Sequence, residues 1–186
     1  MDRLSPLTEA ELTTEQRAVF DAIAGGPRGN MGLIGPFGVY VRAPGVGNAA
    51  QALGAAVRFS TELPENLKEI GICVVGAHTK AKFEFAAHAV LAQKAGVAPD
   101  IVESIRIGEA PEFSDDNEAL AYEVAIALVR RHRLDDALYA RAKAALGETQ
   151  LVELVAAVGY YTLVSYMLNA FEIPLREGMT DPFPEV

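Results

Sequence analysis

Glu84 and His88 are the residues whose types and spacing best suit proton transfer. They stand four positions apart in the run KAKFEFAAH, residues 80–88, and His88 is one of only three histidines in the chain. At this spacing in a helix, two side chains lie on one face, one turn apart, so the carboxylate can accept from a ring nitrogen. Such a bond fixes the tautomer and raises the basicity of the other nitrogen, which suits acid–base chemistry near neutral pH. The same pair is also common on helix surfaces, so the spacing alone leaves both interpretations open.

The surroundings of this pair are apolar, with Phe83, Phe85 and Leu91 close in sequence. A partly desolvated site there would shift pKa values. Glu69 comes earlier, in a predicted first helical turn, and by itself is an ordinary acid. Together with Glu84 and His88 it could offer two carboxylates and one imidazole to a metal, but the sequence gives only a modest signal for this, and no metal is predicted.

The elements that must position these residues are predicted to be helices joined by short loops. Periodic apolar residues, capping residues and glycines predict helices over residues 8–24, 48–59, from 64 to a break at 76–79, 80–95, 99–107, 115–132, 135–147 and 149–171. The expected N-terminal caps include Thr13 or Thr14, Thr79, Ser114 and Thr149. The segment between the first two helices, rich in glycine and proline, is expected to be a loop, with room for a short extended piece at FGVYVR. Almost no segment alternates as a strand does, so the predicted class is all-α.

The length of 186 residues fits one domain, with an N-terminal arm of about residues 1–47 and a short C-terminal tail of about 175–186. Apolar residues make up 51% of the chain and charged residues 22%, which is enough to bury a core. The net charge of −9 argues against nucleic acid and anionic membranes as partners. A small molecule is the expected partner.

The cellular location of the protein is predicted from its N-terminal segment, its apolar stretches and its cysteine content. The N-terminal segment has no apolar core of signal-peptide length. The longest apolar stretch, residues 154–170, contains Gly159, three tyrosines and Asn169 and is expected to be a buried helix, not a membrane span. The single cysteine, Cys73, excludes an internal disulfide. We therefore expect a cytoplasmic protein.

A longer pattern supports the chemical interpretation of Glu84 and His88. The run KEIGICVVGAHTKAKFEFAAHAVLAQKAGV, residues 68–97, resembles the core signature of the carboxymuconolactone decarboxylase family, which includes the alkylhydroperoxidase-D-like proteins. GPFGVYVRAPGVG and LVELVAAVGYYTLVSYMLNAFEIPL resemble other parts of the family, and the resemblance spans roughly residues 15–175. The matching elements of the core run are Lys68 and Glu69, the break at Gly76 to Thr79, Glu84 and Phe85, His88, and the closing Ala95, Gly96 and Val97.

The resemblance implies an all-α helical bundle that assembles as a homo-oligomer, a trimer or a hexamer, with sites in pockets near subunit contacts. The peroxidase branch of the family carries a Cys-x-x-Cys pair where this chain has Ala81 and Glu84. Two-cysteine peroxide chemistry within one chain is therefore excluded, and Cys73 is expected to be a core residue. The chain fits the branch that lacks the cysteine pair, which needs neither a metal nor an organic cofactor.

This branch implies a proton-transfer enzyme that acts on a small unsaturated lactone or carboxylic acid, as 4-carboxymuconolactone decarboxylase does. Our hypothesis makes His88 the general acid and base, with Glu84 orienting it and Glu69 as a second proton-handling group. Arg42 is the candidate for gripping a substrate carboxylate, because the guanidinium fork matches that geometry. Isomerisation, hydration or dehydration of a related substrate remain alternatives, as does a non-catalytic oligomeric binding protein. The residues expected to line the pocket are Tyr40, His78 and Tyr161.

Overall fold

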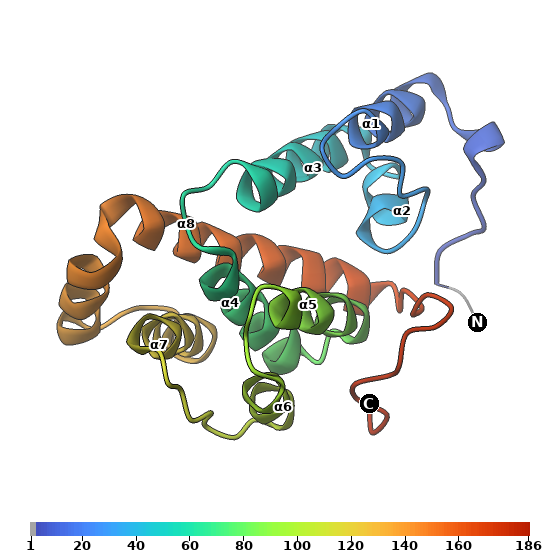
Figure 1. Ribbon diagram of the computed structural model, residues 1–186. Coiled ribbons are helices and arrows are strands. Elements are labelled where there is room, and N and C mark those ends of the chain that lie inside the picture. Colours follow the sequence, from blue (N-terminus) through green and yellow to red (C-terminus); the bar gives the residue numbers. More distant parts are fainter. Residues whose placement is uncertain (1–2) are drawn as a thin grey trace.

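The computed structural model describes residues 3–186, which form eight α-helices and one 3-10 helix, with no strand in this range (Figure 1). The all-α prediction is confirmed. The elements are η1 Glu9–Glu11, α1 Thr14–Ala24, α2 Pro36–Tyr40, α3 Pro44–Phe59, α4 Glu65–Thr79, α5 Lys82–Lys94, α6 Pro99–Ile107, α7 Asp116–Arg131 and α8 Asp136–Ala170.

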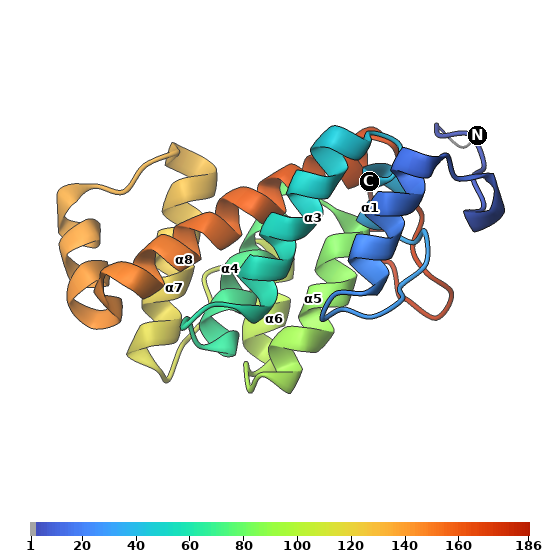
Figure 2. The ribbon, with the colours of Figure 1, turned by 90° about the horizontal axis from the view of Figure 1, so that it is seen from above.

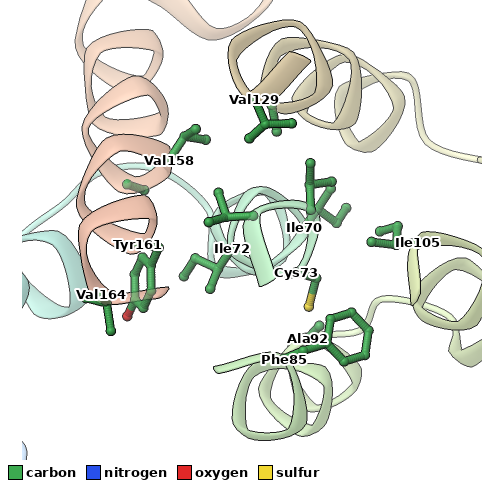
Figure 3. Packing of buried hydrophobic residues seen from close by; sticks show 14 of the residues in the cluster. Ile70, Ile72, Cys73, Phe85, Ala92, Ile105, Val129, Val158, Tyr161 and Val164 are labelled. Atoms are coloured by element: carbon green, nitrogen blue, oxygen red, sulfur yellow. The ribbon is translucent and has the colours of Figure 1, made fainter. Parts of the chain in front are cut away.

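Helix α4 is the central element of the bundle. It packs against α5, α6, α7 and α8, and residues 67–76 are all buried. Figure 3 shows Ile70, Ile72 and Cys73 of α4 amid side chains from the helices around it. A helix enclosed on every side is apolar all round instead of along one stripe. Any acid on this stretch of α4, such as Glu69, must therefore lie inside the protein.

The N-terminal helices form a separate layer. Val19, Phe20, Phe37 and Tyr40 belong to a smaller core shared by α1, α2 and α3. Helices α2 and α3 also pack against α8, and in the view from above α1 and α3 run side by side (Figure 2). Much of the predicted arm is thus helical, although its first two residues lie outside the described part of the chain. This layer places Arg58, in the last turn of α3, within hydrogen-bond distance of Glu69 of α4 and His88 of α5.

The structure corrects the expected extended piece at FGVYVR, because most of it lies in α2. Pro36 occupies the first turn of this helix, where proline's fixed φ and missing N–H are tolerated. Gly35 before it has φ 58°, a conformation that favours glycine. Phe37 and Tyr40 are then buried in the N-terminal core, which a solvent-facing loop could not achieve.

Two predicted caps are also corrected. Thr79 does not cap α5, since its Oγ1 donates to the Val75 carbonyl at 2.8 Å within α4. Ser114 is replaced as the cap of α7 by Asp115, whose carboxylate accepts from two backbone N–H groups of the first turn. In both cases the helix begins one or two residues later than predicted.

Helix α8 combines the last two predicted helices. Gly147 has φ 75° and interrupts the helical geometry, which confirms a break at this glycine. Helix α8 is long and apolar enough to cross a membrane by length and composition, with a mean hydropathy of 1.6 over its most apolar window. Half of that window is buried inside the protein, where α8 packs against α4 and α7. It is a core helix of the bundle, as predicted.

The segment after α8 folds back onto the bundle. Phe183 is fully buried, and its ring lies 5.3 Å from that of Phe85, centroid to centroid. Lys82 pairs with Asp181 at 2.8 Å, and Arg106 donates to the Pro182 carbonyl at 2.8 Å. Residues 171–186 are therefore held against α6 and against α5, the helix that carries Glu84 and His88.

Candidate functional site

The structure brings Glu69, Glu84 and His88 together. His88 Nδ1 lies 2.6 Å from Glu69 Oε2, and Nε2 lies 2.9 Å from Glu84 Oε1. The Glu69 side chain is fully buried, and those of Glu84 and His88 are 5% and 7% exposed. The imidazole thus lies between two carboxylates, hydrogen-bonded through Nδ1 to Glu69 and with Nε2 at ion-pair distance from Glu84.

Helix geometry explains this clamp. Glu84 lies in the first turn of α5, where the helix dipole favours negative charge. His88 follows one turn later on the same face. Glu69 reaches the ring from the opposite side because α4 and α5 pack against each other. The sequence spacing set the first contact, and tertiary packing supplied the second.

Arg58 is a further member of the cluster that the sequence did not reveal. Its Nη1 donates to Glu69 Oε1 at 2.7 Å and lies 3.3 Å from His88 Nδ1. Lys68 fixes this end of α3, because its Nζ donates to the Arg58 carbonyl at 3.1 Å. Arg58 stands eleven residues before Glu69 on another helix, so only a signal from α3–α4 packing could have found it.

The charges of the cluster balance. Burial lowers the pKa of His88, but the carboxylates of Glu69 and Glu84 outweigh it and raise that pKa to about 9. Burial likewise disfavours the charged form of Glu69, yet His88 and Arg58 hold its pKa below the usual value. At neutral pH, therefore, two cations, Arg58 and the His88 imidazolium, face two carboxylates.

A pocket of about 250 Å³ opens beside the cluster. Glu84, His88 and Arg58 line it, whereas Glu69 does not. Tyr161 of α8 also lines it and presents a ring edge-on to the imidazole, with centroids 4.8 Å apart. No side chain within residues 3–186 hydrogen-bonds to Glu84 Oε2. The pocket therefore offers a small molecule one free carboxylate oxygen next to an imidazolium.

The other predicted residues lie in different places. Tyr161 lines the pocket, and Tyr40 stands behind it, with its hydroxyl 2.9 Å from that of Tyr160, a lining residue. Arg42 lines a different cavity of about 530 Å³ beside the N-terminal arm. His78 lies in the last turn of α4, facing residues of α7 and α8.

Arg42 and His78 are therefore not brought to the pocket with His88. The physical reason for Arg42 is that its guanidinium donates to two backbone carbonyls, that of Gly38 in α2 and that of Ser5 at 2.5 Å. For His78 it is the helical phase, since residues on different faces of α4 meet different neighbours.

The cluster is not arranged as a metal centre. Among residues 3–186, no group of three His, Cys, Asp or Glu side chains is placed to hold an ion. The two ring nitrogens of His88 already face separate carboxylates, so neither nitrogen is directed at a point shared with Glu69 and Glu84.

Cys73 lies in the core formed around α4 (Figure 3). Its side chain is fully buried, and burial raises the pKa of the thiol well above the ordinary value. It is therefore a neutral core thiol and not an available thiolate.

The order and packing of the helices define an alkylhydroperoxidase-D-like fold. No protein-family model matches the chain, and no curated protein matches its sequence. The chain is instead similar in fold to several solved structures.

One such structure is an uncharacterised peroxidase-related protein from Silicibacter sp. TM1040, with a TM-score of 0.74 and 14% identity over 96% of this chain and 93% of that one. Another is the debrominase Bmp8 without ligand, with a TM-score of 0.70 and 15% identity over 92% and 91% of the two chains. A third is a Bmp8 variant with one cysteine replaced by alanine, in complex with 2,3,4-tribromopyrrole, with a TM-score of 0.69 and 16% identity over 93% and 91%. At these identities the likeness carries the fold alone.

Proposed function

We propose that the protein is a cofactor-independent enzyme that moves protons on a small unsaturated lactone or carboxylic acid. The observation that carries the proposal is the buried Glu69–His88–Glu84 clamp, of which two members open on a pocket of about 250 Å³. Perturbed titratable groups that converge on a concave pocket are typical of catalytic sites.

The geometry suggests a division of roles. Glu84 is the proposed base, because its Oε2 is open to the pocket. His88, charged at neutral pH, is the proposed acid and electrostatic partner. Glu69 does not line the pocket, so it acts through His88 as a positioning residue that keeps the ring charged and oriented.

The proposed step begins with a substrate C–H bond next to a carbonyl group. Glu84 removes the proton, and the electron pair of the broken bond moves through the conjugated system onto the carbonyl oxygen. The positive charges of His88 and Arg58 stabilise the resulting oxyanion. Return of the proton to another carbon gives an isomer.

In decarboxylation, the C–C bond to the departing CO2 breaks instead of the C–H bond. The electron pair follows the same route onto the carbonyl oxygen. The acid form of the Glu84–His88 pair then donates a proton to carbon, which completes the balance. The 4-carboxymuconolactone decarboxylase reaction is of this type, and it is the specific reaction that the sequence resemblance favours.

The two solved relatives raise peroxidase-related chemistry and debromination as alternatives. A thiol-dependent version of either would have to use Cys73, the single cysteine of the chain. That thiol is fully buried and neutral. The pocket chemistry therefore supports proton transfer over thiol chemistry, and we expect no peroxide consumption with a dithiol reductant.

The test is proton exchange and turnover with a set of unsaturated lactones and dicarboxylic acids in D2O, followed by NMR. Glu84→Gln and His88→Ala should each lower the rate by on the order of 10²–10⁴. Glu118→Gln is the matched control, because Glu118 is another buried glutamate that is hydrogen-bonded to Asn66 and is not part of the pocket lining. Full activity in both site variants would refute the proposal.

A further inference from the structure

Two arginines in the pocket lack an acidic partner. Arg28 and Arg176 both line it, and neither forms an ion pair with a carboxylate within residues 3–186, to judge by all N–O distances up to 4.0 Å. Arg58 differs, since Glu69 neutralises it. Guanidinium groups beside a pocket attract carboxylates, which match their fork.

Arg28 is held by aromatic rings. Its guanidinium lies 5.7 Å from the ring centroids of both Phe37 and Phe59. Its Nη1 donates only a long bond of 3.3 Å, to the Gln51 carbonyl. A cation–π contact holds a guanidinium near an aromatic ring without using its N–H donors.

The backbone of α3 is adapted to this arrangement. A Cβ atom on Gly54 would lie 2.7 Å from Arg28 Nη2 and would collide with the Tyr160 hydroxyl. Only a glycine at this position lets the arginine and the tyrosine approach the helix together.

Arg176 comes from the C-terminal segment. Its guanidinium lies 5.3 Å from the centroid of the Phe83 ring. Its Nε is buried and has no hydrogen-bond partner within residues 3–186. An unsatisfied buried donor is costly, and it leaves the charge of this guanidinium uncompensated within the described residues. The burial of Phe183 and the Lys82–Asp181 pair anchor the segment that delivers this arginine.

We propose that Arg28 and Arg176 together bind a carboxylate of the substrate and make the pocket selective for small organic acids over neutral lactones. This inference rests on the proposed function and names its substrate class. The charges around the pocket support it, since Arg28 and Arg176 add two positive charges to a cluster whose own charges balance. The protein as a whole carries a net charge of −9, so this positive lining is a local feature.

The experiment is isothermal titration of the full chain with maleate, fumarate and cis,cis-muconate, and with their dimethyl esters as neutral controls of the same carbon skeleton. We expect at least one acid to bind and its ester to bind about tenfold more weakly or not at all. Arg28→Gln and Arg176→Gln should each weaken binding of the acid by roughly tenfold.

Arg42→Gln is the matched control, because Arg42 lines the neighbouring cavity and was the sequence-based candidate for the same task. It should change the affinity by less than about twofold. Arg176→Lys, which keeps the charge and loses the fork, is a second variant in case Arg176→Gln does not fold, and it should also weaken binding.

Several results would overturn the inference: no acid binds, the esters bind as tightly as the acids, or the Arg28 and Arg176 variants keep wild-type affinity. Because binding is measured without turnover, failure here is separable from failure of the proposed function. An acid that binds through the two arginines but exchanges no proton would overturn only the catalytic proposal. Proton transfer that persists unchanged in both arginine variants would overturn only this inference.

Discussion

Replacing Glu69 by glutamine removes the buried negative charge between Arg58 and His88 and keeps the shape of the side chain. In the native protein this carboxylate accepts from both groups, at 2.7 Å and 2.6 Å. After the substitution Arg58 retains only Glu65, 3.8 Å away, and His88 retains only Glu84. Removing one partner of a buried ion pair costs about 3–5 kcal/mol, so we expect a loss of that order at pH 7.

The pH dependence gives a sharper form of the same prediction. The pKa of His88 is raised from 6.5 to about 9 in the folded protein. A raised pKa stabilises the folded state, and this contribution is fully present at pH values below the pKa of the unfolded state. It is lost as the pH rises through the pKa of the folded state. At 1.36 kcal/mol per pKa unit, the native protein should lose about 3 kcal/mol between pH 6.5 and pH 9. The pKa of Glu69 is lowered, so its own contribution is present above 4.5 and is lost as pH falls through its folded value.

Urea unfolding at intervals from pH 4 to 10 measures the stability lost in Glu69→Gln and the pH dependence of stability in both proteins. NMR of the imidazole ring protons, assigned with a His88→Ala variant, reports the pKa of His88 directly. In Glu69→Gln the fall in stability above pH 6.5 should be much smaller, because one of the two carboxylates that raise the pKa of His88 is gone. Glu118→Gln, which touches no histidine, should leave the slope unchanged. A native His88 that titrates near 6.5, with a flat stability curve up to pH 9, would refute the reasoning.

Three further substitutions test the frame around the site. Gly54→Ala should destabilise the protein by about 1–3 kcal/mol in urea unfolding, because the added methyl displaces Tyr160 and Arg28. The substitution should also weaken acid binding in the calorimetric titration. Unchanged stability and affinity would contradict the close approach of Tyr160 and Arg28 to α3. Phe183→Ala should cost about 3–5 kcal/mol, because a fully buried ring is lost, and thermal unfolding that stays within a degree of wild type would show that the C-terminal segment is not anchored. Gly147→Ala should cost about 1–2 kcal/mol because φ is 75° there, and no change in the urea midpoint would argue against the kink in α8.

Most of the helices could be predicted because their signals are local. Gly147 marked the break in α8, and α6 spans Pro99–Ile107, the range that the sequence predicted. The expected extended piece near Phe37 was wrong because a five-residue helix has too few periodic positions to be recognised. The cap at Thr79 was wrong because a hydroxyl can bond backward to its own helix as well as forward to the next one.

The candidate site shows the same difference between contacts within one helix, which the sequence could predict, and contacts between distant segments, which it could not. The Glu84–His88 contact lies within one helix and could be inferred from spacing alone. Glu69 entered through a family resemblance, and the three arginines of the pocket were missed entirely. Arg28 precedes α2, Arg58 lies in the last turn of α3 and Arg176 follows α8. These arginines are far apart in the sequence, so no local pattern could have shown that they share a pocket. The arginine that the sequence did favour, Arg42, is used to hold backbone carbonyls.

The balance of charge separates Arg58, which belongs to the cluster around His88, from the two arginines that we assign to carboxylate recognition. Arg58 is neutralised by the fully buried Glu69, so its charge is already balanced before any ligand arrives. Arg28 and Arg176 are held by aromatic rings, which fix their positions without neutralising them. A carboxylate that enters the pocket would therefore find its strongest attraction at these two side chains and not at Arg58. The balanced cluster can then keep His88 charged whether the pocket is empty or filled, which is what a proton donor needs at the moment of reaction.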